Sequence, residues 1–430
     1  MRTSPFDTLL MPHNWSVFKF GGASVKDSEA LRNAVRLVRD YGKAPLLVVV
    51  SAMGKTTNAL ERFIQARELG QHDEAQRELL EIASFHEGIA QELGLLDPEL
   101  RDQLQALWAQ ADRVNSEQAY NPRYDATVSL GEIASSLLFA AALRADGRDS
   151  HWLDARRVLR TDATYRRASV DWSQTQAAVL EALSNPAEVT VTQGFIGSAP
   201  DQSTTTLGRE GSDYSAAVFA QSLQAKVLCI WKDVPGMLSA DPKVFEGAVL
   251  LEEVPYREAI ELAFYGASII HPKTIQPLAQ GGTLLQIRSF VNPEAAGTEV
   301  GPFAALRPEV PCWIRHENQV LIEVASRDFT FLSEGNLSEV YRIFAEEGLL
   351  VRAAQHRALS TQFAVHNDRI AVPRALERLN AGYRASAEFG LRMTTVRRPD
   401  AESLADLLSS GSLRMVLRNH EVAQVLTAPD

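Results

Sequence analysis

Near its start the chain carries a lysine that is directly followed by a glycine turn. Lys19 stands at the end of a short apolar run, and Gly21 and Gly22 precede an amphipathic segment that begins at about Ser28. Glycines let backbone N–H groups approach an anion closely, and a helix N-terminus adds partial positive charge. The pattern therefore indicates a phosphate site, although a tight turn with a solvated lysine explains it equally well.

A second loop, rich in short hydrogen-bond donors, follows the next apolar run. Ser51 and Thr57 enclose the segment 54–56, whose Gly-Lys-Thr sequence resembles the end of a P-loop. Val49 stands where that motif requires its first glycine, so a Walker motif is rejected. The hydroxyls suit a bound carboxylate or phosphate, or they cap the helix that follows.

The densest group of functional side chains lies between residues 204 and 217. Three threonines and two glycines accompany Arg209, Ser212 and Asp213, just before an alanine-rich helical segment. A guanidinium is a planar fork that can grip a carboxylate with two hydrogen bonds. Ser212 and Asp213 could cap the helix, but packing does not explain the whole group, and we favour a binding site.

Three other positions are weaker candidates. Glu132 is predicted in the first turn of a helix, where an acidic side chain complements the helix dipole. Lys232, Asp233 and Lys243 follow a buried strand and could form a nucleotide edge, or a plain turn. His271 has no second metal ligand at a suitable spacing, so we interpret it as structural.

The candidates require a scaffold of parallel strands joined by helices. The segment 45–50 is a continuous apolar run, typical of a strand buried on both faces, and further strands are predicted at 17–20, 188–193, 226–231 and 284–289. Helical spacing predicts two or three helices within 61–118. Proline and glycine punctuate 292–311, which we interpret as a linker with a domain boundary near 305.

Beyond this linker the predicted order of elements changes. The predictions are, in order, a strand at 320–324, a helix at 337–347, strands at 349–354 and 360–366, a helix at 371–381 and a strand at 383–389. This β-α-β-β-α-β order is that of the ferredoxin-like split motif. A short helix near 401–409 and a strand near 413–418 follow it.

Composition limits the class of protein. The 430 residues favour two to four domains, and 45% hydrophobic with 23% charged residues is ordinary for a globular protein. A net charge of −11 argues against a nucleic-acid partner. Cys229 and Cys312 have apolar neighbours and are interpreted as core thiols of a reduced compartment. Because neither a membrane-length apolar run nor a signal-peptide pattern is present, we expect a cytoplasmic protein without a membrane partner.

The motifs, in this order, resemble the aspartate kinase family within the wider amino acid kinase fold. The matching segments are Phe18–Val25, Val50–Gly54 with Thr57 and Asn58, Leu130–Glu132, Thr204–Ala217, Asp233–Gly236 with Ala240–Pro242, and Glu261–Ala267 with His271 and Pro272. The resemblance implies an α/β fold, the amino acid kinase (carbamate-kinase-like) α/β/α sandwich with a mainly parallel sheet, over residues 15–305. A weaker match implies a ferredoxin-like ACT regulatory region over 316–430, whose second unit is shortened.

The activity that the resemblance implies is ATP-dependent phosphorylation of the β-carboxylate of L-aspartate to 4-phospho-L-aspartate, the first step of lysine, threonine and methionine synthesis. A carboxylate with a solution pKa near ~4 is ionised at neutral pH and needs no general base. The site therefore has to position the reactants and neutralise the charge on the transferring phosphoryl group. Magnesium is expected with the ATP phosphates, without a protein carboxylate that holds it directly.

The same resemblance assigns roles to individual residues. Lys19 would neutralise the transferring phosphoryl group, and Asp213 would organise Lys19 and the substrate. Arg209 would clamp the substrate α-carboxylate and Glu132 its ammonium group. The remaining substrate-binding residues would be Ser51, Thr57 and Ser212, and the ATP-binding residues Lys19, Gly21, Gly22, Lys232, Asp233 and Lys243.

The chain departs from the family at several motif positions. Where the family usually has Thr, Gly, Thr, Tyr and Lys, this sequence has Ala23, Glu210, Lys232, Leu238 and Ser268 respectively. The last change removes a nucleotide-site lysine. We expect Lys232 or Lys273 to supply the missing cation.

The regulatory region departs further. Lysine-inhibited members present an acidic residue and hydroxyls after the first regulatory helix, whereas residues 350–357 of this chain are basic. A basic surface repels a cationic effector, so we expect weak or absent lysine inhibition. By analogy, pairing through the ACT region predicts a homodimer.

Two alternatives compete with this interpretation. Another amino acid kinase would act on acetylglutamate, glutamate or a nucleoside monophosphate, but Glu132 and Arg209 together suit a free α-amino acid. A non-catalytic amino-acid sensor would explain Ala23 and Ser268. The retained Lys19, Arg209 and Asp213 argue against the sensor.

Overall fold

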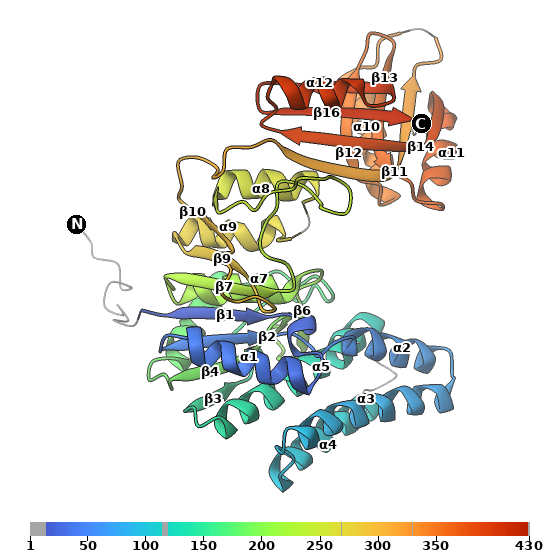
Figure 1. Cartoon of the computed structure of the whole chain (residues 1–430). Coiled ribbons are helices and arrows are strands. Elements are labelled where there is room, and N and C mark those ends of the chain that lie inside the picture. The colour runs from blue at the N-terminus through green and yellow to red at the C-terminus, as the bar shows by residue number, and fades with distance from the viewer. Residues whose placement is uncertain (1–13, 114–118, 268, 329, 429–430) are drawn as a thin grey trace, which may run out of the picture. The chain divides into compact units, whose positions relative to one another are not determined.

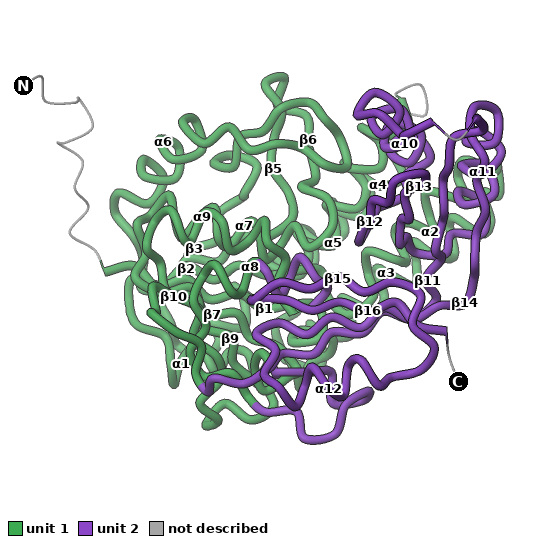
Figure 2. Tube along the Cα trace, turned by 90° about the horizontal axis from the view of Figure 1, so that it is seen from above, with its two compact units in different colours: residues 1–237, 250–260, 269–307 green, residues 238–249, 261–268, 308–430 purple. Residues whose placement is uncertain are grey.

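The computed structural model describes residues 14–113, 119–267, 269–328 and 330–428. The chain divides into two compact units, drawn in different colours in Figure 2. Unit 1 comprises residues 1–237, 250–260 and 269–307, and unit 2 comprises 238–249, 261–268 and 308–430. Two short segments of unit 2 therefore come from the part of the sequence that otherwise builds unit 1.

Unit 1 is built on an eight-stranded sheet with the order β3-β4-β2-β1-β7-β9-β10-β8 (Figure 1). Its strands are β1 Ser16–Phe20, β2 Leu46–Val50, β3 Ser150–Leu153, β4 Val189–Gln193, β7 Val227–Lys232, β8 Glu253–Pro255, β9 Leu284–Ser289 and β10 Thr298–Gly301. Neighbouring strands are parallel except β9 and β10. Every residue of β1, β2 and β4 is buried, which explains the continuous apolar sequence of β2. The predicted parallel α/β sheet is confirmed.

Helices cover both faces of this sheet, as the side chains of β1 make clear. The helices are α1 Ser28–Tyr41, α2 Thr56–Glu68, α3 His72–Glu92, α4 Pro98–Arg113, α5 Tyr120–Ala145, α6 Trp172–Ala182, α7 Gly211–Ser222, α8 Tyr256–Tyr265 and α9 Pro272–Gly281. Phe20 packs against Phe139 of α5 with ring centroids 5.4 Å apart. Lys19, the neighbour of Phe20, points to the opposite face and meets Asp213 of α7. The sheet therefore lies between two helical layers.

The central helix α5 is long and apolar enough, by length and composition, to cross a membrane. Of its most apolar window, 78% is buried inside the protein, as is typical of a core helix. The two or three helices predicted within 61–118 correspond to α2, α3 and α4; residues 114–118 lie outside the described part of the chain.

Unit 2 holds a six-stranded antiparallel sheet with the order β12-β13-β11-β14-β16-β15. Its elements are β11 Cys312–Ala325, α10 Glu334–Glu346, β12 Val351–His356, β13 Ser360–His366, α11 Ala371–Gly382, β14 Arg384–Arg397, α12 Ala401–Ser409, β15 Ser412–Arg418 and β16 Val422–Ala428. The predicted β-α-β-β-α-β order is confirmed from β11 to β14. Strand β16 is an additional strand that the sequence analysis missed.

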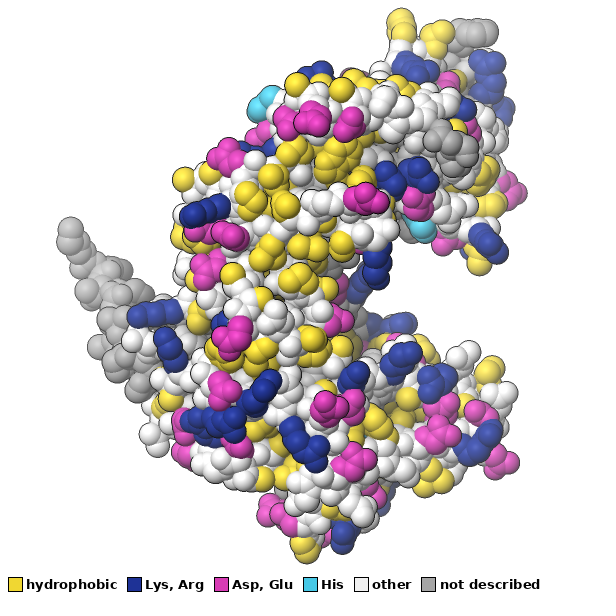
Figure 3. Space-filling view, in the orientation of Figure 1, with side chains coloured by type: hydrophobic (Ala, Val, Ile, Leu, Met, Phe, Trp, Pro, Cys, Tyr) yellow, Lys and Arg dark blue, Asp and Glu magenta, His cyan; other side chains and the backbone are white. Residues whose placement is uncertain are grey.

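Three hydrophobic clusters pack against this sheet, and two of them lie under its helices. Ile322, Phe344 and Phe363 belong to the cluster under α10 and α11, whereas Leu407 and Val425 belong to the one under α12. Strands β11 and β14 are each 14 residues long and reach both clusters. On the face drawn in Figure 3, acidic and basic side chains are interspersed.

The interpretation of residues 292–311 as a linker is wrong in part. This stretch contains β10, which pairs with β9 and β8 in the main sheet. The strand is only four residues long, so its own sequence carries too little periodicity to predict it.

Candidate active site

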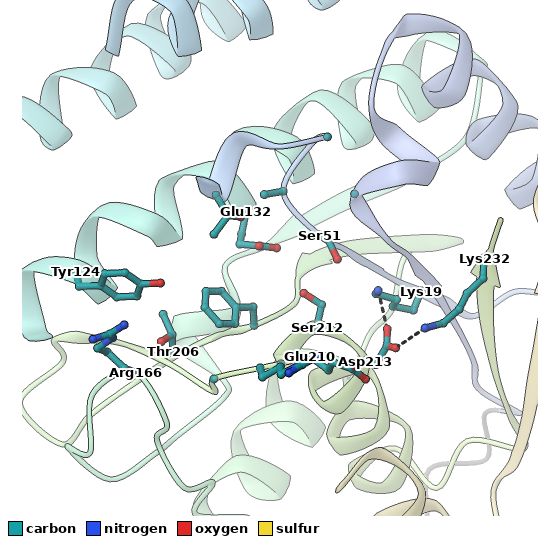
Figure 4. Close-up of a pocket in the computed structure, with 18 residues that line it drawn as sticks. Lys19, Ser51, Tyr124, Glu132, Arg166, Thr206, Glu210, Ser212, Asp213 and Lys232 are labelled. Carbon is teal, nitrogen blue, oxygen red and sulfur yellow. Dashed lines mark hydrogen bonds and ion pairs between the residues drawn. The ribbon is translucent and has the colours of Figure 1, made fainter. Parts of the chain in front are cut away.

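A cavity of about 580 Å³ opens in unit 1 where β1, β2 and β7 end. Ligands of open α/β sheets bind at the carboxyl ends of the strands, and this cavity has that position. Figure 4 shows its lining side chains. The residues from the sequence prediction that line it are Lys19, Gly22, Ser51, Thr57, Glu132, Arg209, Ser212, Asp213 and Lys232.

The loops after β1 and β2 are held together by direct backbone contact. Gly54 N donates to Gly22 O at 3.0 Å, and Ser51 N donates to Phe20 O at 3.0 Å. A Cβ atom at Gly22 would lie 2.8 Å from the carbonyl oxygen of Ala52, so only glycine permits this approach. The contact places Lys19 and Ser51 on the wall of one cavity (Figure 4).

Asp213 joins two lysines at one end of the cavity. Its two carboxylate oxygens lie 2.6 Å from Lys19 Nζ and 3.1 Å from Lys232 Nζ. Lys232 Nζ also donates to the carbonyl oxygen of Ile269 at 2.6 Å. Burial alone raises the pKa of Asp213, but the charges of both lysines outweigh it and hold the pKa below its ordinary value. The carboxylate therefore stays ionised and fixes two ammonium groups beside the cavity.

Neither Ser212 nor Asp213 caps α7. The residue that precedes this helix is Glu210, and no side chain makes a capping hydrogen bond there. The capping interpretation of this segment is therefore wrong. Both side chains line the cavity instead (Figure 4).

Glu132 lies within α5 and not at a helix start, so that prediction is wrong. The helix begins at Tyr120, and Gly131, which resembled a boundary, serves close packing instead. A Cβ atom at Gly131 would lie 2.9 Å from Thr56 Cγ2 and 3.3 Å from Ala52 Cβ. Glycine thus lets α5 approach the loop after β2 and brings Glu132 against it.

The carboxylate of Glu132 is buried and incompletely satisfied. Its exposed fraction is 3%, and its Oε2 atom has no hydrogen-bond partner among the described residues. Burial raises the pKa of Glu132 to about 8, against smaller lowering by a backbone hydrogen bond from Ala52 and by the charge of Lys19. A buried acceptor without a partner is costly, so this position suits a ligand cation.

The wall away from Lys19 contains three residues that the sequence analysis missed, Tyr124, Arg166 and Phe195. Thr206 and Glu210, from the predicted 204–217 group, line the cavity with them. The Arg166 guanidinium lies over the ring of Tyr124, 4.4 Å from its centroid. The stacking holds the positive charge of Arg166 on the side of the cavity away from the two lysines (Figure 4).

Asp125 anchors this wall to α5. Its carboxylate accepts hydrogen bonds from Arg166 N at 2.9 Å, and from Thr206 N and Thr206 Oγ1 at 2.8 Å each. Burial raises the pKa of Asp125, although these hydrogen bonds lower it in part. The partners are 41 and 81 residues away in the sequence, and no local pattern could have revealed them.

Several predicted residues do not join the cavity lining. Gly21 lies beside it, since a Cβ atom there would be 3.3 Å from Lys19 Nζ. Asp233 and Lys243 are exposed and do not line the cavity. Ser268 lies outside the described residues. Lys273 also lies outside the lining, with its Nζ over the ring of Tyr214, 4.3 Å from the centroid.

The interpretation of His271 as structural and the core position of the two cysteines are confirmed. His271 precedes α9 and caps it, because its Nδ1 atom accepts a hydrogen bond from Lys273 N at 3.1 Å. Cys229 and Cys312 are both buried. Within the described ranges, no group of three His, Cys, Asp or Glu residues could hold a metal ion.

The sequence of the chain is similar to that of known proteins. The model of the amino acid kinase family matches residues 14–289. The lysine-sensitive aspartokinase 3 of Escherichia coli is 34% identical over 344 residues, covering 78% of this chain and 74% of that protein. The chloroplastic bifunctional aspartokinase/homoserine dehydrogenase 2 of Arabidopsis thaliana is 32% identical over 302 residues, but the matched part is only 32% of its length.

Solved structures give the same relationship. Escherichia coli aspartokinase III in complex with lysine and aspartate matches 97% of this chain and 96% of its own, with a TM-score of 0.81 and 29% identity. The same enzyme in complex with aspartate and ADP has a TM-score of 0.78 and 29% identity, with 96% of each chain covered. The similarity therefore extends over both units.

Proposed function

Because the chain belongs to the amino acid kinase family, and within it to the aspartokinases, we propose that it transfers the γ-phosphoryl group of ATP to the β-carboxylate of L-aspartate. The products are 4-phospho-L-aspartate and ADP. The observation that carries the proposal is that one cavity holds the paired lysines at Asp213 and the buried carboxylate of Glu132. The lysines suit a phosphate, and Glu132 suits an ammonium group.

The substrate is held at its α-carbon end. The ammonium group of aspartate pairs with Glu132, whose Oε2 atom lacks another partner among the described residues. The Arg209 guanidinium lines the same cavity and takes the α-carboxylate. Ser51, Thr57 and Ser212 donate to the reacting end. These contacts hold the β-carboxylate in place for attack, and such positioning of the reactants lowers the activation barrier.

The transfer itself needs charge neutralisation rather than a base. An oxygen of the ionised β-carboxylate attacks the γ-phosphorus, a P–O bond forms, and the bond from that phosphorus to the β-γ bridging oxygen breaks. The electron pair leaves with ADP. Lys19 stabilises the charge on the transferring group, and Asp213 keeps Lys19 in place.

The nucleotide side is proposed to include Lys232, Gly21, Gly22, Asp233 and Lys243. Lys232 supplies the cation that Ser268 no longer provides, since it faces the cavity. Magnesium enters as part of the ATP complex. The carboxylate of Asp213 forms ion pairs with two lysines, and no metal-binding cluster occurs among the described residues. We therefore assign no protein ligand to the magnesium ion.

We place the reaction at the entry to lysine, threonine and methionine synthesis in the cytoplasm. The kinase domain is assigned to residues 15–305 and an ACT-like regulatory region, with a shortened second unit, to 316–430. By analogy the protein forms a homodimer through the latter region. Size-exclusion chromatography with light scattering tests this assembly, and a mass of 47.3 kDa would contradict it.

The test is direct detection of the acyl phosphate. Purified protein is mixed with ATP, magnesium, L-aspartate and hydroxylamine, and aspartyl hydroxamate is measured. Aspartate-dependent hydroxamate supports the proposal. Product with N-acetylglutamate or glutamate in place of aspartate would indicate another amino acid kinase. No turnover with any acceptor, together with measurable amino-acid binding, would indicate a sensor.

A further inference from the structure

Unit 2 contains a second cavity of about 510 Å³. Four segments that are distant in the sequence form it: the loop 239–249, residues 310–315 at the start of β11, Thr394 of β14, and the region of α12. All of its lining residues belong to unit 2, so it is separate from the cavity that holds Lys19. A volume in the range of about 300–1,000 Å³ is typical of small-molecule sites.

Arg315 is the principal polar group of this cavity. Its guanidinium stacks on Phe245, 4.5 Å from the ring centroid, and its Nε atom is buried without a hydrogen-bond partner. Burial lowers the pKa of Arg315, the nearby charge of Arg392 adds to this effect, and the charge of Glu317 opposes it in part. A buried guanidinium N–H without an acceptor is costly, and a planar anion removes that cost.

The neighbouring arginine provides a contrast. Arg392 Nε donates to both carboxylate oxygens of Glu317, at 2.9 and 3.0 Å. Across the part of the chain that the structure describes, no comparable hydrogen bond or ion pair involves the Arg315 guanidinium. Arg315 is therefore the arginine that is available to an incoming anion.

The remaining walls restrict the kind of anion. Phe245 and Trp313 have ring centroids 5.5 Å apart and form an apolar side with Val310. Glu246 and Asp406 are exposed lining residues, and their negative charge opposes a dianion such as phosphate but accepts an ammonium group. The walls thus favour one negative charge on an apolar body.

We propose that this cavity binds a small monocarboxylate with an apolar or aromatic body, a class that includes the apolar α-amino acids. The carboxylate lies on Arg315, and the body lies against Phe245 and Trp313. An ammonium group, where the ligand has one, faces Glu246 and Asp406. The proposal concerns unit 2 alone and does not depend on the kinase activity.

The experiment is calorimetric titration of the full chain with four probes. They are 3-phenylpropionate, L-phenylalanine, 3-phenylpropylamine and inorganic phosphate. All titrations use an Arg209→Ala protein, so that carboxylate binding in the first cavity does not contribute. We expect the two carboxylates to bind, and the amine and phosphate to bind at least about tenfold more weakly. Absence of carboxylate binding, or equal binding of the amine or of phosphate, would overturn the proposal.

Variants then locate the site. Arg315→Gln should weaken 3-phenylpropionate binding at least about tenfold, while the matched control Arg392→Gln should change it less than about threefold. Because Arg315→Gln removes a buried unsatisfied N–H group, its Tm without ligand should equal or exceed that of the parent. Equal binding by the parent and the Arg315→Gln protein would overturn the assignment.

A third variant covers the case in which Arg315→Gln does not fold. Phe245→Leu keeps an apolar side chain but removes the ring under the guanidinium. It should weaken 3-phenylpropionate at least about threefold. Unchanged affinity in this variant would contradict the proposed position of the ligand.

Discussion

At the scale of single residues, Lys232 offers the most direct test of the proposed nucleotide side. Its Nζ is fixed between Asp213 and the carbonyl of Ile269, at the cavity and beside Lys19. We predict that Lys232→Ala raises the KM for ATP about tenfold, because a charge-assisted contact to a phosphate is lost. Lys273→Ala is the control, since Lys273 is partly buried but does not line the cavity. An unchanged KM for ATP in Lys232→Ala, measured by steady-state kinetics, would contradict this role.

Glu132 gives the cavity a pH dependence. Only its ionised form attracts the substrate ammonium group, and its pKa is raised to about 8. We therefore predict that kcat/KM for aspartate rises roughly tenfold per pH unit below that pKa and levels off above it. In Glu132→Gln the overall value should be low and this rise absent. A wild-type profile that is flat between about pH 6 and 8 would contradict the prediction.

The same pKa also determines the sign of a stability effect. The ordinary pKa of this carboxyl is 4.5, so between about 4.5 and 8 the folded protein retains a proton that the unfolded chain has released. The contribution of Glu132 to stability is complete below the lower value and is lost as the pH rises through the upper one. The free energy of unfolding of the ligand-free protein should fall across this range. Glu132→Gln should remove that part of the fall.

Glu210 occupies a backbone position that favours glycine. Its φ is 55°, and its Oε2 atom is buried without a hydrogen-bond partner. We predict that Glu210→Gly increases the free energy of unfolding by about 1 kcal/mol, since relief of strain exceeds the added chain entropy. Glu81→Gly, in the exposed interior of α3, should instead lower it by about 1 kcal/mol. Denaturant titration measures both, and a loss of stability in Glu210→Gly would refute the argument.

At the scale of elements, the close contact of α5 with the loop after β2 positions Glu132. We predict that Gly131→Ala destabilises the protein by about 1–3 kcal/mol and raises the KM for aspartate, because its Cβ would meet Thr56 at 2.9 Å. Gly88→Ala in α3 is the matched control, since nothing lies within 4 Å of its Cβ, and it should stabilise by about 1 kcal/mol. Thermal denaturation and aspartate kinetics check both variants. Equal behaviour of the two would contradict the packing argument.

An element can be predicted from the sequence where local contacts determine it, and not where contacts between distant segments do. Strand β2 is predictable because burial on both faces forces a continuous apolar run, and β9 is predictable because every second residue is buried. The four residues of β10 form a strand because they pair with β8 and β9, and a local sequence pattern cannot show this pairing. Gly131 indicates a helix boundary locally, but tertiary packing determines its role.

The cavity itself is predictable to the extent that it follows strand ends. Lys19, Ser51 and Lys232 were identified because each lies at or just after the end of a strand. Arg166 was not, since its place depends on the long-range hydrogen bond from its backbone N–H to Asp125 and on the ring of Tyr124. Such contacts join segments that no sequence window contains.

At the scale of the whole molecule, the chain combines an α/β unit that holds the proposed kinase site with an antiparallel unit that has its own cavity. The similarity to Escherichia coli aspartokinase III covers nearly the whole of both chains, and one solved complex of that enzyme contains lysine. Regulation by lysine is therefore the property in which the two proteins can be compared most directly.

The basic residues within 350–357 indicate that this chain responds to lysine differently from that relative. Arg352 is half-buried and its guanidinium lies beside His316, whose Nε2 atom donates to the carbonyl oxygen of Tyr265 at 2.7 Å, so the segment keeps a positive charge. A cationic effector requires carboxylates and is repelled by such a surface. We predict that roughly 10 mM lysine changes the rate of hydroxamate formation less than about twofold. Escherichia coli aspartokinase 3, which is named lysine-sensitive, serves as the positive control in the same assay. Half-maximal inhibition of this protein below about 1 mM lysine would show that the basic segment does not prevent effector binding.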